Sequence, residues 1–167
     1  MRLTALTAVA SMTLAGMALA GPVFAAPASV DITVGPEFQK KIDKTYGTRE
    51  ATLLTSDLRE AVEKALARTP AYDGARIELT LVDAKPNRPT FKQLSDKPGL
   101  SMESFGVGGA SIEGRVVAAD GTETPVAYKW YETDLRNAYG NWVWSDATWT
   151  FDRFARRLAR GGELAQR

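Results

Sequence analysis

The stretch from Gly99 to Asp134 constrains the fold of this chain more than any other, because it has the pattern of a long β-hairpin. Residues 110–119 and 124–133 are each rich in residues that favour strands, and Asp120-Gly121 lies between them. A tight turn at that point needs a residue that tolerates a positive φ, as glycine does. A hairpin of this length needs a second layer to cover it, so the rest of the chain must supply one.

Two amphipathic segments can form that layer. Residues 48–68 place apolar side chains at helical spacing behind Thr48, a plausible N-cap, and residues 148–160 repeat the spacing. Residues 30–34 and 75–84 alternate apolar and polar side chains and read as strands. The expected order is therefore β-α-β-β-β-α. This order predicts an α+β two-layer sandwich, with a mostly antiparallel sheet of roughly three to five strands and two main helices on one face.

The first 25 residues have the pattern of a signal peptide. Arg2 is the only charge, residues 3–20 are apolar or small, and residues 23–25 suit a cut before Ala26. A retained transmembrane anchor is the alternative, but four hydroxyl side chains interrupt a run that is only about long enough to span a bilayer. We expect a periplasmic or secreted protein whose residues 26–167 form one α+β domain, with a frayed tail at 161–167.

The chain contains neither cysteine nor histidine. Disulfides, a lipid-bearing cysteine, Ser-His-Asp triads and the usual zinc sites are therefore all excluded. Without residues 1–25, the chain carries 20 basic and 20 acidic side chains, which gives no electrostatic case for binding nucleic acid. We expect no metal, no cofactor and no stable membrane anchor.

Residues 85–109 form a long, proline-containing stretch that predicts a loop. It reads either as a solvent-side excursion packed by Phe91, Leu94 and Leu100 or as a flap that binds a partner. The glycines at 106, 108 and 109 lack the lysine and the following helix of a phosphate-binding loop. We interpret them as relief for a bulge or bend where the next strand begins.

All four tryptophans lie within residues 130–149. Trp142 and Trp144 flank Val143, so in an extended segment they would share a face, which would bind a ligand if it pointed outward. We name Trp142, Trp144 and Tyr139 as candidate binding residues, with a purely structural cluster as the alternative. Trp130 and Trp149 are expected to pack between helix and sheet.

Carboxylates are the remaining candidates for catalysis, since exported glycan hydrolases use them in pairs. No spacing in the sequence brings two of them to catalytic distance, so no catalytic residue is assigned and the chain is not expected to be an enzyme. The carboxylates considered are Asp83, Asp120, Glu123, Glu132, Asp134 and Asp146.

Five phrases carry a family resemblance: DITVGPEF, YGTREATLLTSDLREAVEKAL, ARIELTLVDAKP, GGASIEGRVVAADG and DATWTFDRFARRLA. Across most of residues 26–167 they resemble small exported proteobacterial domains of unknown function, which are distantly similar to α+β domains of outer-membrane assembly lipoproteins. The resemblance implies a binding or scaffolding role in the cell envelope, and it supplies no catalytic residues. The expected partner is therefore an envelope protein. A cell-wall glycan bound on a tryptophan face is the alternative.

Overall fold

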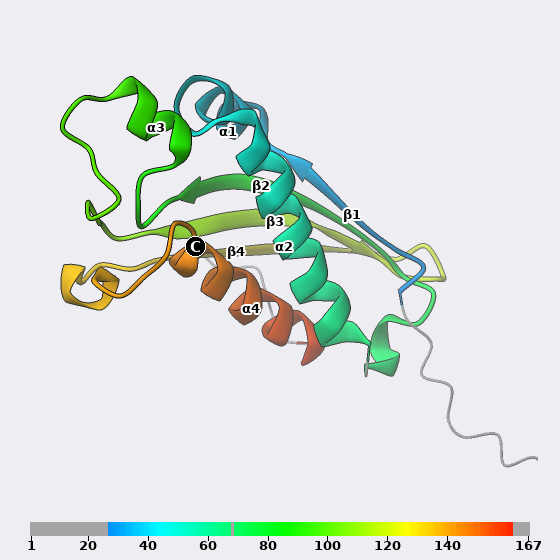
Figure 1. Cartoon of the computed structure of the whole chain (residues 1–167). Helices are drawn as coiled ribbons and strands as arrows, with labels where there is room; N and C mark the ends of the chain where they lie inside the picture. Colours follow the sequence, from blue (N-terminus) through cyan, green and yellow to red (C-terminus); the bar gives the residue numbers. More distant parts are fainter. Residues whose placement is uncertain (1–26, 68, 162–167) are drawn as a thin grey trace, which may run out of the picture.

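Four strands form a single sheet in the order β1-β2-β3-β4, so that strands adjacent in sequence are also adjacent in space (Figure 1). The computed structural model describes residues 27–67 and 69–161, and the proposed signal peptide and the tail beyond 161 lie outside this part. The sheet is mixed, because β1 pairs parallel with β2 while the other two pairings are antiparallel. The strands are β1 (Ser29–Val34), β2 (Arg76–Lys85), β3 (Gly109–Val117) and β4 (Glu123–Tyr131).

The two long helices, α2 and α4, cover one face of this sheet (Figure 1). This confirms the predicted α+β fold and its β-α-β-β-β-α order, to which the structure adds short helical segments. The helical elements are α1 (Pro36–Lys41), a π-helical turn η1 (Ile42–Tyr46), α2 (Thr48–Leu66), η2 (Pro70–Tyr72), α3 (Phe91–Asp96), η3 (Leu135–Ala138) and α4 (Ser145–Ala159).

The core lies between the two helices and the sheet. Along α2 the buried residues recur every four positions, at Leu54, Leu58, Val62 and Leu66, which places them on one stripe. Every second residue of β2 faces them, including Ile77 and Leu79. Burying one such side chain stabilises the fold by about 1.5–3 kcal/mol. The stripe therefore fixes which face of α2 meets the sheet and which face is left for solvent.

The β3–β4 hairpin turns where the sequence predicts. Gly121 has a φ of 86°, and the Asp120 side chain accepts a hydrogen bond from the backbone of Thr122. The opposite side of β4 is a free edge of the sheet. Because the backbone N–H of Glu132 donates to Gly108, the even-numbered residues of β4 bond to β3. Pro125 consequently lies on the outward side of the edge, where a residue without an N–H interrupts no pairing within the sheet.

Two local predictions need correction. The expected loop at 85–109 contains the helix α3, which begins at a complete capping box between Thr90 and Gln93. Thr48 is the first residue of α2 and not its N-cap. Gly47 holds the cap position with a φ of 103° and no side-chain hydrogen bond.

The glycines before β3 allow close backbone approach. A Cβ on Gly109, whose φ is 148°, would overlap the backbone of Trp130 and Tyr131. A Cβ on Gly108 would meet Asn87. The bulge itself lies in β2, where the register shifts between Leu81 and Asp83. Gly108 and Gly109 therefore permit close backbone packing where β3 begins, and the bulge expected at these glycines lies in β2 instead.

Candidate functional site

The three predicted binding residues lie in two different environments. Tyr139 and Trp142 are strongly exposed, at 72% and 68%, whereas Trp144 is buried at 4%. Trp142 and Trp144 therefore do not form an exposed face together, because the chain here is not extended. It turns into α4, and the Ser145 side chain accepts a hydrogen bond from the Trp142 backbone. Trp144 is then carried inward while Trp142 stays outside.

Trp144 is anchored at both ends of its ring system. Its indole Nε1 donates to Glu50 Oε2 on α2 at 2.7 Å, and its ring stands edge-on to Tyr46 at 5.5 Å between centroids. A buried tryptophan usually finds such a partner for its N–H. The ring therefore forms a fixed floor between the start of α4 and the start of α2.

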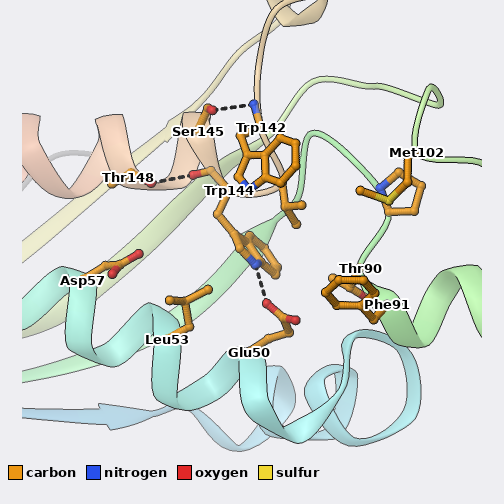
Figure 2. Close-up of a pocket in the computed structure, with 12 residues that line it drawn as sticks. Glu50, Leu53, Asp57, Thr90, Phe91, Met102, Trp142, Trp144, Ser145 and Thr148 are labelled. Carbon is orange, nitrogen blue, oxygen red and sulfur yellow. Dashed lines mark hydrogen bonds between the residues drawn. The ribbon is translucent and has the colours of Figure 1, made fainter.

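Above this floor lies a hollow of about 430 Å³. Figure 2 shows Trp142 and Trp144 at its centre, with Leu53 on the α2 side and Phe91 and Met102 on the opposite side. Leu53, Phe91, Met102 and Trp142 are all exposed, so apolar side chains from several segments meet solvent at the hollow. We call this the α2–α3 hollow. It is lined by Glu50, Leu53, Asp57, Pro89, Thr90, Phe91, Met102, Trp142, Val143, Trp144, Ser145 and Thr148.

Local structure explains why large apolar side chains are exposed here. The capping box starts α3 at Phe91 and leaves that ring 80% exposed, so Phe91 does not pack the loop as expected. On α2, Glu50, Leu53 and Asp57 follow one another at helical spacing, so they lie together along one side. Leu54 and Leu58 direct the adjacent side of the helix into the core. The hollow is thus formed by one side of α2, the start of α3 and the turn that leads into α4.

A buried carboxylate joins the segments that form the walls. Asp146 in the first turn of α4 is fully buried and accepts hydrogen bonds from Asn87 Nδ2, Asn141 Nδ2 and the Gly108 backbone, at 2.6, 2.9 and 2.8 Å. Asn87 Oδ1 accepts in return from the Asp146 backbone at 2.9 Å. These bonds bring the chain on both sides of α3 against the start of α4.

Arg88 extends the same connection towards the surface. Its guanidinium donates to the backbone carbonyls of Met102, Tyr139 and Asn141, at 2.7, 2.8 and 2.5 Å. Figure 1 shows α3, the loop after it and η3 gathered at the same end of the sheet. Arg88 therefore fixes the Met102 wall of the hollow against the turn that carries Trp142. We call Asn87, Arg88, Asn141 and Asp146 the polar clamp.

A second aromatic pair lies beside the hollow. Phe105 and Tyr139 meet edge to face with their centroids 5.6 Å apart, and both side chains are exposed. Together with Leu53, Phe91, Met102 and Trp142 they form what we call the apolar end. Contiguous exposed apolar surface of this kind is characteristic of interaction sites.

The remaining tryptophans differ from expectation in one case. Trp130 is half-buried under the guanidinium of Arg153, which lies 4.1 Å from its ring centroid. Trp149 is 45% exposed, so the prediction that it packs between helix and sheet was wrong. It lies on α4 outside the hollow, which makes it a useful control residue below.

The carboxylates considered for catalysis are engaged in structural contacts. Asp83 pairs with Lys41 at 2.8 Å and accepts from the Tyr131 hydroxyl at 3.0 Å. This contact and burial raise the pKa of Tyr131, with burial the larger cause. Asp120, Glu132 and Asp134 accept from their own loop backbones, Glu123 pairs with Arg115, and Asp146 belongs to the polar clamp.

Electrostatically, the hollow is acidic. Glu50 and Asp57 are the two ionisable residues of its lining, and Glu50 is already bonded to Trp144. Partial burial, and to a lesser extent the nearby charge of Glu60, raise the pKa of Asp57. In residues 27–67 and 69–161, no group of three or more acidic side chains is placed to hold a metal ion.

Comparisons with known proteins supply no family. A scan against models of protein families found no match to this chain, and a search of curated proteins found none either. In the part of the chain that the structure describes, no helix combines the length and apolarity needed to cross a bilayer.

The sequence predicted the aromatic residues near α4 and missed the residues that α2 and the 85–109 segment contribute. Tyr139, Trp142 and Trp144 stand out by residue type, whereas Phe91 and Met102 lie in a stretch read mainly as a loop. The Thr90-x-x-Gln93 pattern was the available signal, since it marks a helix start. Nothing in the sequence indicates that α2 passes beside this loop, so Leu53 and Asp57 could not be added.

Proposed function

We propose that this protein is a non-catalytic binding domain of the cell envelope, and that the apolar end is its contact with an envelope protein. The observation that carries the proposal is the α2–α3 hollow, ringed by exposed Leu53, Phe91, Met102 and Trp142. Ordered apolar side chains cost free energy when they face water, so a folded surface that holds them out is explained by an occupant. The envelope location rests on the export pattern of residues 1–25.

The walls of the hollow are held in place by hydrogen bonds, which favours a binding surface over apolar side chains exposed by chance. The walls are held by buried hydrogen bonds of the polar clamp, at Asn87 and Asp146, and by the three-pronged contact of Arg88. A preorganised surface loses little conformational entropy when a partner arrives. An apolar side chain from a partner segment would fill the hollow above Trp144.

Glycan binding is the second candidate, favoured by the exposed rings of Trp142 and Tyr139. Aromatic faces can stack on sugar rings, and the alternative predicted from sequence used these residues. Sites for polar ligands also need several convergent polar groups to fix orientation. The opening of the hollow is formed mainly by apolar side chains, so a protein segment is the better supported occupant.

Site-specific photo-crosslinking in cells tests the proposal. A photoreactive phenylalanine in place of Met102 is expected to capture a discrete partner, whereas the same residue in place of Glu113 is not. Glu113 is exposed on β3 away from the helices, so it reports chance encounters. Trp142→Ala should abolish capture at position 102, and Trp149→Ala, the matched control, should leave it unchanged.

The result can also contradict the proposal. Equal capture from both positions, or capture that survives Trp142→Ala, would show that the apolar end is not the contact. Tryptophan emission with soluble peptidoglycan fragments separates the second candidate. If fragments protect Trp142 from acrylamide quenching and no protein is captured, glycan binding replaces protein binding.

A further inference from the structure

The α2–α3 hollow has a charge preference that its apolar walls do not reveal. Its two ionisable residues, Glu50 and Asp57, are both acidic, and neither lysine nor arginine contributes to the lining. An occupant that fills the hollow therefore meets carboxylates and no cation. If the hollow binds a protein segment, as proposed above for its function, this lining selects the charge of that segment.

The two carboxylates are not equivalent. Glu50 Oε2 accepts the indole N–H of Trp144 at 2.7 Å, so this side chain already has a structural partner. The Asp57 side chain makes no hydrogen bond or ion pair to any other residue in 27–67 and 69–161. It is half-buried, and burial raises the pKa of its carboxyl group. Its charged form is thus incompletely hydrated, and a nearby cation would stabilise it.

Geometry places this carboxylate within reach of the apolar walls. Figure 2 shows Asp57 at one end of the hollow, Phe91 at the other, and Trp142 and Trp144 between them. Asp57 is seven residues after Glu50 on α2, which corresponds to about 10 Å along the helix axis. An extended peptide advances about 3.3 Å per residue and alternates its side chains, so residues two apart project to the same side about 6.6 Å from each other, and a long side chain can cover the remaining distance.

The aromatic walls favour a positive group as well. The exposed faces of Trp142 and Phe91 carry negative electrostatic potential, which attracts lysine and arginine side chains. The aliphatic stem of such a residue can also cover apolar surface while its charged head reaches water or a carboxylate. Acidic and aromatic groups in one hollow therefore select the same kind of residue.

We propose that the partner segment seated in the α2–α3 hollow carries a lysine or arginine two residues from an apolar residue. The apolar side chain lies on Trp142 and Phe91, and the cation pairs with Asp57. Asp57 is thus the specificity-determining residue of the site, and Trp144 is its fixed floor.

Three capped peptides that differ at one position test the proposal. Each has the form acetyl-Gly-Leu-Gly-Xaa-Gly-amide, with lysine, norleucine or glutamate at Xaa. Binding to the purified protein is followed by the shift of the Trp142 indole N–H resonance in proton–nitrogen NMR, assigned with Trp142→Phe. The lysine peptide is expected to bind roughly threefold to tenfold more tightly than the norleucine peptide, and the glutamate peptide most weakly. Added salt should narrow the difference.

Variants of α2 assign the preference to one residue. Asp57→Asn should bring the lysine and norleucine peptides to within about twofold of each other, and Asp57→Glu should retain the preference. Glu63→Gln is the matched control, because Glu63 is an exposed acid on the same helix outside the hollow.

Each outcome has a definite reading. Equal binding of the lysine and norleucine peptides would overturn the cation inference and leave the apolar site standing. A preference that survives Asp57→Asn would overturn the role of Asp57. If none of the three peptides shifts the Trp142 resonance, the proposed peptide-binding function fails together with the inference.

Discussion

At the scale of single residues, the hollow contains a carboxylate, Asp57, whose ionised form destabilises the folded state. Asp57 is half-buried beside Leu53, and burial raises the pKa of its carboxyl group. A raised carboxyl pKa means that the protonated form is favoured in the folded state relative to the unfolded chain. Above that pKa the ionised Asp57 therefore lowers the free energy of unfolding, and below the pKa of the unfolded chain the effect disappears.

Asp57→Asn is consequently expected to preserve or slightly raise stability at about pH 7, by no more than about 0.5 kcal/mol. The advantage over the parent protein should shrink as the pH falls to about 3, below the usual pKa of an aspartate, where the parent carboxyl is mostly protonated in both states. Urea denaturation at the two pH values measures this. A variant that is markedly less stable than the parent at pH 7 would show that Asp57 has a structural partner.

The two tryptophans of the turn show what can be predicted for single residues. Their type and clustering indicate an aromatic site, and Trp142 is exposed as a binding residue must be. Which of the two points outward depends on where α4 begins. A change from extended chain to helix start at Ser145 reverses the side to which Trp144 projects, and no periodicity in so short a segment fixes that point.

At the scale of elements, the polar clamp attaches the segment between β2 and β3 to the start of α4. Residues 86–108 pair with no strand, yet Asn87 and Asp146 bond to each other twice. In the described part of the chain, Asp146 has neutral hydrogen-bond donors and no ion-pair partner. Buried carboxylates of this kind require all of their donors, because a lost donor or a lost acceptor leaves a buried polar group unpaired.

Asp146→Asn is expected to lower the free energy of unfolding by about 2–3 kcal/mol, since the new amide group would face existing donors. Asn87→Ala should have a similar effect, and the double variant should cost less than the sum because both changes break one network. Denaturant titration measures all three. Asp152→Asn, an exposed position on the same helix, should change stability by less than about 0.5 kcal/mol.

If Asp146→Asn lowered the free energy of unfolding no more than Asp152→Asn does, the polar clamp would be contradicted. The peptide titration provides a second readout, because a loosened clamp should also broaden the Trp142 indole resonance.

Helices and strands could be predicted where the apolar pattern repeats over a long segment. The apolar stripe of α2 and the paired strands around Asp120-Gly121 gave the layers and their order. The short helix α3 was not predicted because its six residues complete less than two turns. Its start is fixed by a side-chain cap and its position by Arg88, and both depend on contacts that periodicity does not encode.

At the scale of the whole molecule, the binding surface and the stable centre of the fold are separated. The central strands β2 and β3 each have two hydrogen-bonded neighbours, and the helices cover one side of them. Apart from Leu53 on α2, the apolar end lies beyond these strands, on segments fixed mainly by side-chain hydrogen bonds. We therefore expect the two regions to open with different free energies.

Hydrogen exchange followed by mass spectrometry should show slowest exchange in β2 and β3 and faster exchange across residues 89–105. The lysine peptide is expected to slow exchange in residues 89–105 and 139–145 while the central strands stay unchanged. The glutamate peptide serves as the control. Protection of β1 or of the sheet face opposite the helices would place the contact elsewhere.

The position of Pro125 on the free edge of β4 affects whether copies of this chain can stack edge to edge. A neighbouring copy that tried to extend the sheet along β4 would find no donor at Pro125 and a charged side chain at Lys129. A parallel, in-register pairing of two β4 strands would lose a hydrogen bond near its start and bring lysines together near its end. Amyloid-like growth along this strand is therefore disfavoured by the chain itself.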